Sequence, residues 1–133
     1  MNKQRPTVLV IEDEWLLQQA ICKKLELNGL KAIPYTDGNE ALNYLQDLSD
    51  PPDIIWLDYQ LRDMNGLEFI DKLKKNTKCA HIPVIVVSNS ASDAKVHSML
   101  ALGVREYILK AKYRLDEIIL LVKGIIAEKK GYD

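Results

Sequence analysis

The sequence predicts an α/β domain in which a five-stranded parallel sheet carries helices on both faces. Short runs of branched apolar residues alternate with longer amphipathic segments five times along the 133 residues. Such strand–helix units favour a parallel sheet, because a crossover helix must bring each strand back alongside its predecessor. The length suits one domain. We therefore expect residues 1–133 to be a single domain with a core at about 7–129 and no output domain.

The first two predicted strands flank an amphipathic helix. Residues 8–11 form a continuous β-branched run, which is typical of a strand buried on both faces. Residues 30–35 are less apolar and contain Pro34, which lacks a backbone donor, so we place this strand at the sheet edge. The helix between them has apolar residues four apart and stops at an Asn-Gly pair: Leu17, Ile21, Leu25 and Asn28-Gly29.

The other elements continue the alternation. Strands are predicted at 54–57, 84–87 and 107–109. Asp37 and Asn65 are expected to cap the second and third helices, because short polar side chains satisfy the free N–H groups there. The fourth and fifth helices should turn these residues inward: Val96, Met99, Leu100 and Gly103, then Leu115, Ile118, Ile119, Val122 and Ile126.

Composition and charge exclude several classes of protein. Hydrophobic residues make up 47% of the chain and charged residues 28%, as in globular proteins. The net charge is −1 without a basic field, so we expect no nucleic-acid partner. No signal-peptide core and no apolar run of roughly 20 residues occurs, so we expect a cytoplasmic protein without a membrane partner. Cys22 and Cys79 lack metal-ligand spacing and are interpreted as reduced thiols.

Chemically active side chains lie at the predicted strand ends. The first strand runs into Glu12 and Asp13, the third ends at Asp58, the fourth at Ser88 and the fifth at Lys110. Open parallel sheets bind ligands at the carboxyl ends of their strands. If the first and third strands are neighbours, the three carboxylates converge, which raises a pKa or recruits a cation. Oxygen ligands with room for water suit Mg²⁺.

Each of these residues also has an ordinary explanation. An acid at the start of a helix is often an N-cap, and that is the simpler account for Glu12 or Asp13 taken singly. Ser88 alone would be a turn residue, and Lys110 alone a surface lysine. The combination of four strand ends carrying complementary chemistry favours a functional site.

These residues resemble the receiver domain of bacterial two-component signalling, from residue 8 to about 129. The implied fold is flavodoxin-like, a three-layer (βα)5 sandwich with strand order 2-1-3-4-5. The correspondence rests on the first strand with its acidic pair, the phosphorylated aspartate with a glycine eight residues later, the switch hydroxyl, the switch aromatic and the lysine: residues 8–14, Asp58, Gly66, Ser88, Tyr107 and Lys110.

The resemblance implies a phosphoacceptor rather than an enzyme with turnover. Asp58 would take a phosphoryl group from a histidine kinase, a histidine phosphotransfer protein or a small phosphodonor. Mg²⁺ would be held by Asp13, Asp58 and the backbone carbonyl of Gln60, with Glu12 acting through water. Lys110 would pair with a phosphate oxygen.

The resemblance also implies a switching surface. Ser88 would bond the phosphate, and Tyr107 would follow into the space that it leaves. The surface formed by the fourth helix, the fifth strand and the fifth helix would then bind an unknown downstream protein or form a homodimer. Leu120 projects away from the apolar arc of the fifth helix and should be exposed. Either it is an ordinary exposed leucine, or Leu120 and Tyr113 join Tyr107 in this surface.

Three residues depart from the common family pattern. Arg62 stands where proline is common, and Ala111 rather than proline follows Lys110. Asn89 after Ser88 is larger than the usual residue. We expect these three positions to modulate the kinetics and output of phosphorylation rather than to prevent it. Without the proline, a cis peptide after Lys110 is not expected, because it would cost about 2.5–4 kcal/mol.

Other functions fit the sequence less well. A Toprim-like nuclease and a haloacid-dehalogenase-type phosphatase both need an Asp-x-Asp pair, which neither Asp58-Tyr59-Gln60 nor Asp13-Glu14-Trp15 supplies. The glycine-rich nucleotide-binding motifs do not occur. The remaining alternative is a receiver-like protein-interaction module that is not phosphorylated, and the complete set of charged site residues argues against it.

Overall fold

A computed structural model describes residues 5–90 and 92–130. The prediction that no signal peptide is present also concerns residues 1–4, which lie outside the described residues. Strands and helices alternate as predicted. A short 3₁₀ helix after the fifth strand was not predicted. The elements are β1 (Thr7–Ile11), α1 (Trp15–Leu27), β2 (Lys31–Tyr35), α2 (Gly38–Gln46), β3 (Ile54–Asp58), α3 (Gly66–Lys74), β4 (Val84–Ser88), α4 (Asp93–Ala101), β5 (Glu106–Leu109), η1 (Lys110–Lys112) and α5 (Leu115–Lys129).

The five strands form one parallel sheet in the order β2-β1-β3-β4-β5, which confirms the flavodoxin-like topology. β2 lies at one edge, as the proline in its sequence predicts. At the centre, β1 pairs with β3 so that Ile11 lies opposite Leu57. Glu12, which follows Ile11, and Asp58, which follows Leu57, therefore lie side by side at the carboxyl edge of the sheet.

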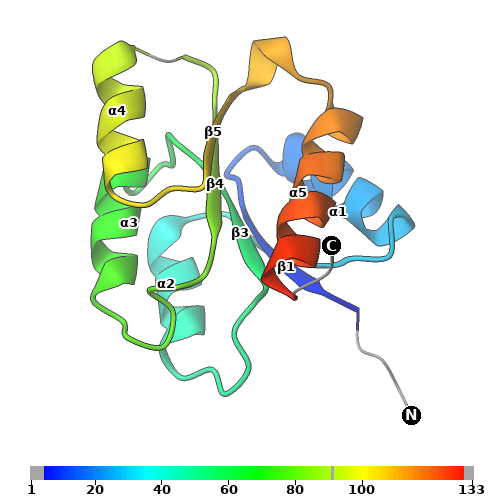
Figure 1. The fold of residues 1–133 in the computed structure, drawn as a ribbon, viewed down its shortest axis with the longest axis horizontal. Helices are drawn as coiled ribbons and strands as arrows, with labels where there is room; N and C mark the ends of the chain where they lie inside the picture. Colours follow the sequence, from blue (N-terminus) through cyan, green and yellow to red (C-terminus); the bar gives the residue numbers. More distant parts are fainter. Residues whose placement is uncertain (1–4, 91, 131–133) are drawn as a thin grey trace.

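Helices cover both faces of the sheet in three layers (Figure 1). α2, α3 and α4 lie on one side, and α1 and α5 lie on the other. Each face of β1 and β3 feeds a separate apolar cluster: Leu9 and Leu57 belong to the α2–α4 side, whereas Val10 and Trp56 belong to the α1–α5 side. β3 and β4 are buried along their whole length, which explains their nearly unbroken apolar sequences.

Side-chain caps define the start of three helices. Asp37 accepts from the Glu40 N–H at 2.8 Å, which confirms its predicted capping role. Asn65 and Glu68 form the reciprocal capping box of α3, with bonds of 3.0 and 3.1 Å. Ser92 accepts from the backbone N–H of Lys95 at 3.2 Å and so begins α4.

The prediction for α4 was partly wrong. Met99 is fully buried, but the Leu100 side chain is 46% exposed and Gly103 lies beyond the end of the helix. α4 ends at Ala101 because Gly103 adopts φ +93°, which a helix cannot continue and which glycine tolerates. Only one face of this short helix therefore reaches the core.

No helix within residues 5–90 and 92–130 combines the length and hydrophobicity needed to cross a bilayer.

Phe69 tests the core on the α2–α4 side, where its side chain is fully buried. We expect Phe69→Ala to lower the free energy of unfolding by about 3–5 kcal/mol, because it removes apolar contacts and leaves a cavity. Urea denaturation provides the measurement. The matched control is Leu27→Ala, whose side chain is 75% exposed and which should change stability by less than about 0.5 kcal/mol. Equal losses in both variants would contradict this packing.

Candidate functional site

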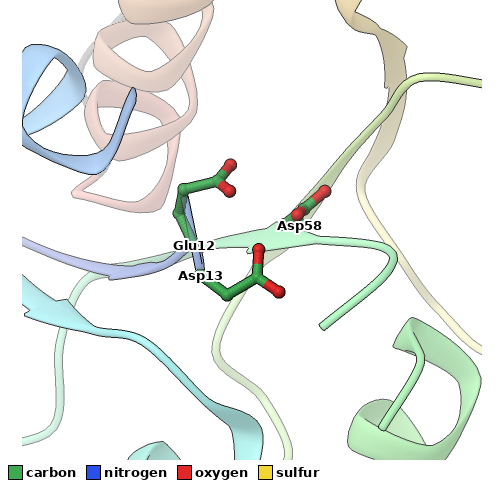
Figure 2. A group of neighbouring side chains, drawn as sticks. All are labelled: Glu12, Asp13 and Asp58. Carbon is green, nitrogen blue, oxygen red and sulfur yellow. The ribbon is translucent and has the colours of Figure 1, made fainter. Parts of the chain in front are cut away.

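Three carboxylates meet at the carboxyl edge of the sheet. Glu12 and Asp13 follow β1, and Asp58 is the last residue of β3, its neighbour. One oxygen of each carboxylate lies within 4.8 Å of those of the other two, and their side chains project into the same space (Figure 2). The expected convergence is confirmed. Its cause is the parallel pairing of β1 and β3, which brings both strand ends to one place.

Glu12 is held in the site by its neighbours. Its side chain is 1% exposed, and its Oε2 accepts the backbone N–H of Glu14 at 3.1 Å. Gln18 donates its side-chain amide to the carbonyls of Glu12 and Tyr35, at 3.0 and 2.9 Å. Sequence reasoning missed Gln18. The signal was a polar residue next to the inward apolar stripe of the first helix, but the sequence did not show which backbone groups it reaches.

The helix-cap explanation is wrong for Asp13, because the residue at the cap position of α1 is Glu14, whose own side chain makes no cap hydrogen bond. Glu12 does bind the Glu14 N–H, so it has a local structural role as well. The bond between Glu12 and the Glu14 N–H does not involve the carboxylates of Asp13 and Asp58. Both line the cavity at this edge of the sheet.

Lys110 connects the end of the fifth strand to this acidic cluster. Its ammonium lies 3.3 Å from Glu12 Oε1 and 3.4 Å from Asp58 Oδ1. It follows β5 directly and begins the 3₁₀ turn η1, which also contains the exposed Ala111. No cis peptide bond occurs among the described residues, so the turn at Lys110 forms from trans peptides without a proline.

The electrostatics of the site are dominated by the cost of burying negative charge. Burial, followed by repulsion from Glu12, raises the pKa of Asp58 to about 7, although Lys110 opposes this shift. Burial alone would lower the pKa of Lys110, but the carboxylates of Asp58 and Glu12 outweigh it and raise the pKa above its usual value. A single ammonium thus offsets the acids only in part.

This donor set fits Mg²⁺. Glu12, Asp13 and Asp58 are hard oxygen donors, and the three carboxylates, when ionised, carry more negative charge than the one Lys110 ammonium beside them offsets. A divalent cation would compensate that charge and favour the ionised carboxylate. Asp13 is half-buried beside a cavity, which leaves room for the water ligands that Mg²⁺ retains.

A cavity of about 380 Å³ lies over the acids. Gln60, Ser88 and Asn89 line it, whereas the exposed Arg62 is outside this lining. Its wall is completed by residues from five stretches of the chain: Glu12, Asp13, Glu14, Asp58, Tyr59, Ser90, Lys95 and Lys110. The size is sufficient for a phosphate-sized group with water.

Ser88 and Tyr107 share one backbone acceptor. The Ser88 hydroxyl donates to the Ser90 carbonyl at 2.8 Å, and the Tyr107 hydroxyl donates to the same oxygen at 2.9 Å. The Tyr107 ring also packs against the ring of Tyr59, with centroids 6.5 Å apart. The two residues expected to switch are therefore joined through Ser90.

The expected grouping of Tyr113 with Tyr107 is not what the structure shows. Tyr113 lines a small cavity with Leu17 and Trp56, on the α1–α5 side of the sheet. Tyr107 packs against the cluster on the other side. The turn η1 redirects the chain after β5, and for this reason residues only six apart face different layers. Leu120 is 67% exposed, as predicted.

The raised pKa of Asp58 predicts a pH-dependent stability. The folded protein binds the Asp58 proton more tightly than the unfolded chain does, so the contribution of Asp58 to stability falls as pH rises from 3.8 towards about 7. In EDTA, the stability advantage of Asp58→Asn over wild type should therefore be larger at pH 8 than at pH 5, by on the order of 2 kcal/mol. Urea unfolding at the two pH values measures it.

Asp71→Asn is the control for this prediction, because Asp71 is exposed on α3 and far from the acidic cluster. Its effect should not grow with pH. Saturating Mg²⁺ should stabilise the wild type, and should stabilise Asp13→Asn less, because binding to the folded state alone raises stability. A pH-independent advantage for Asp58→Asn would show that Asp58 is not strained by charge.

Comparison with known proteins identifies relatives. The response regulator receiver domain family matches residues 8–123. The phosphate regulon transcriptional regulatory protein PhoB of Escherichia coli (strain K12) is 30% identical over 120 residues, which cover 90% of this chain and 51% of PhoB. The two-component response regulator ORR8 of Oryza sativa subsp. indica is 30% identical over 105 residues, 79% of this chain and 86% of ORR8. The chain thus spans about half the length of its PhoB relatives.

Solved structures agree with these sequence matches. The receiver domain of the Francisella response regulator 1452 has a TM-score of 0.83 and 28% identity, covering 93% of this chain and 98% of that one. A CheY-like receiver domain protein from Methanospirillum hungatei JF-1 has a TM-score of 0.85 at 21% identity, over 95% of this chain and 97% of that one, and supports the fold alone. With its topology and the family match over residues 8–123, this chain belongs to the response regulator receiver domain family.

Proposed function

We propose that this domain is a phosphoacceptor of two-component signalling and that Asp58 is the residue phosphorylated. The observation that carries the proposal is the buried Asp58 carboxylate, which lies beside two further acids and 3.4 Å from the Lys110 ammonium under an open cavity. A structural ion pair alone does not account for three converging carboxylates with one cation. Family membership supports the phosphoacceptor role in general.

The proposed reaction is a phosphoryl transfer. An Asp58 oxygen attacks the phosphorus of a phosphohistidine on a histidine kinase or phosphotransfer protein, or of a small phosphodonor. The new P–O bond forms as the P–N bond to histidine, or the P–O bond to the small donor, breaks, and the leaving group keeps the electron pair. Lys110 is positioned to pair with a phosphoryl oxygen of the product. The product is an acyl phosphate on Asp58.

Mg²⁺ would be bound by Asp13, Asp58 and the Gln60 backbone carbonyl, with Glu12 acting through water, and would supply charge compensation for the transferred group. The structure supports this ligand set through the acidic cluster and through the position of Gln60 in the wall of the same cavity. Asp58 must be ionised to act as a nucleophile. Lowering its pKa towards the ordinary range is thus part of the preparation for transfer.

The consequence of phosphorylation would be a change on α4, β5 and α5. Ser88 would turn its hydroxyl from the Ser90 carbonyl to the phosphate. The Ser90 carbonyl, to which the Tyr107 hydroxyl also donates, would then be free to move, and Tyr107 with it. We propose that a downstream protein, or a second copy of the chain, binds this surface in the cytoplasm. The unphosphorylated interaction module remains the alternative, and it predicts no change on treatment with a phosphodonor.

The first test is chemical. Acetyl phosphate with Mg²⁺ should add one phosphoryl group to the wild-type protein, measured as intact mass. Asp58→Asn should abolish the adduct because it removes the nucleophile, and EDTA should suppress it because the acidic cluster cannot accept a further anion without the cation. Asp71→Asn, which changes an exposed acid of α3, should be phosphorylated normally. An undiminished adduct in Asp58→Asn would move the acceptor to another residue.

The second test concerns the switching surface. Beryllofluoride, a phosphoryl mimic, should change amide hydrogen exchange in α4 and β5 of the wild-type protein. Ser88→Ala should still bind the mimic but should lose most of this response, because the link through Ser90 is broken. Ser98→Ala, at an exposed position of α4, should respond like wild type. A response confined to the loops around the cavity would refute the switching surface and leave the phosphorylation of Asp58 standing.

A further inference from the structure

Lys95 is a second cation facing the cavity over Asp58. It is the third residue of α4, and its backbone N–H is fixed by the Ser92 side chain at 3.2 Å. Its side chain is half-buried and lines the same cavity as Asp58 and Lys110. Lys95, in the first turn of α4, and Lys110, directly after β5, thus line the same cavity as the acids.

The ammonium of Lys95 rests on an aromatic ring. Its Nζ lies 4.3 Å from the centroid of Tyr59, the residue directly after Asp58. Among the described residues, no carboxylate oxygen lies within 4.0 Å of this ammonium, unlike that of Lys110. The face of a tyrosine ring attracts a cation through its quadrupole. The ring therefore holds the Lys95 ammonium at the cavity that Asp58 also lines, without an ion pair to a described carboxylate.

The Tyr59 ring, on which the Lys95 ammonium lies, is held firmly in place. Its side chain is only 7% exposed, its N–H donates to the Val87 carbonyl at 3.1 Å, and its carbonyl accepts the Gly66 N–H at 2.7 Å. A Cβ at Gly66 would approach the ring to 2.9 Å, so the small glycine leaves the space that the ring needs. The ring cannot follow Lys95 if the cation moves.

A phosphoryl group on Asp58 would change the balance of attractions on Lys95. A phosphate carries up to two negative charges and three acceptor oxygens, and charge-assisted bonds to such oxygens are stronger than the attraction of a cation to an aromatic face. The lysine stem is flexible enough to move its ammonium between neighbouring partners. α4 is a short helix with only Met99 fully buried, so its first turn offers little resistance to displacement.

We propose that Lys95 is a second phosphate-binding cation, which rests on the ring of Tyr59 while Asp58 is free and moves onto a phosphoryl oxygen when Asp58 is phosphorylated. This transfer draws the first turn of α4 towards the site. It acts on α4 directly, in addition to the route through Ser88 and Tyr107. The inference rests on the proposed phosphorylation of Asp58.

The position of Lys95 can be observed by NMR. In the resting protein, the ring current of Tyr59 should shift the Lys95 ε-CH₂ protons upfield from those of an exposed lysine such as Lys123. The signal is assigned with Lys95→Gln, and Tyr59→Leu should abolish the upfield shift. Adding Mg²⁺ and beryllofluoride to wild type should return the Lys95 protons towards ordinary values, because the ammonium leaves the ring.

Affinity for the phosphoryl mimic supplies the second measurement. Lys95→Gln should weaken beryllofluoride binding on the order of fivefold, as expected for losing one partly exposed charge-assisted contact. Lys123→Gln removes an equal charge from α5, outside the cavity, and should bind as wild type does. A loss of the same size in both variants would mean that only net charge matters and would overturn the role of Lys95.

The outcomes separate this inference from the proposed function. If wild type shows no beryllofluoride binding and no phosphoryl adduct, both fall together. If wild type binds the mimic but the Lys95 protons keep their upfield shift and Lys95→Gln binds equally well, the role of Lys95 is overturned and Asp58 remains the acceptor. If the shift is lost and the affinity falls as stated, Lys95 is a phosphate ligand.

Discussion

The structure depends on one ammonium shared between two buried carboxylates. Lys110 lies 3.3 Å from Glu12 and 3.4 Å from Asp58, and so it joins the end of β5 to the ends of β1 and β3. A buried carboxylate is costly unless it is paired. With three acids and one lysine, the pairing is incomplete, and the pKa of Asp58 rises to about 7. The site is thereby left ready to bind a cation.

The apolar layers make this incomplete pairing tolerable. β1, β3 and β4 are buried against helices on both faces. The burial of their apolar side chains stabilises the fold and offsets the cost of the buried carboxylates. Open α/β folds place reactive groups at the carboxyl ends of the strands. There the rigid sheet fixes the side chains, and the loops that follow can change conformation around them.

The proposed response to a phosphoryl group on Asp58 would have two physical routes in this chain. One passes through the Ser90 carbonyl, which both the Ser88 and the Tyr107 hydroxyls now use. The other is the proposed movement of Lys95 from the ring of Tyr59. The first route would reach Tyr107 on β5, the edge strand opposite β2, and the second would reach the first turn of α4. A local change in charge thus has a defined surface on which to act.

The sequence by itself determined the element types, their order and the chemistry at the strand ends, because strand burial and helix amphipathicity follow from residue periods that neighbours along the chain display. It also indicated that Glu12, Asp13 and Asp58 converge, once β1 and β3 were taken as neighbours.

Only the tertiary structure decided the contacts between residues far apart in sequence: Gln18 on two backbone carbonyls, Lys95 on the ring of Tyr59, and Tyr113 on the opposite side of the sheet from Tyr107. The early end of α4 escaped prediction for a related reason, since apolar spacing at Leu100 does not reveal where the helix stops and which face meets the core. Periodicity specifies which side of an element is apolar, whereas side-chain partners depend on how the packed layers and turns bring distant atoms together.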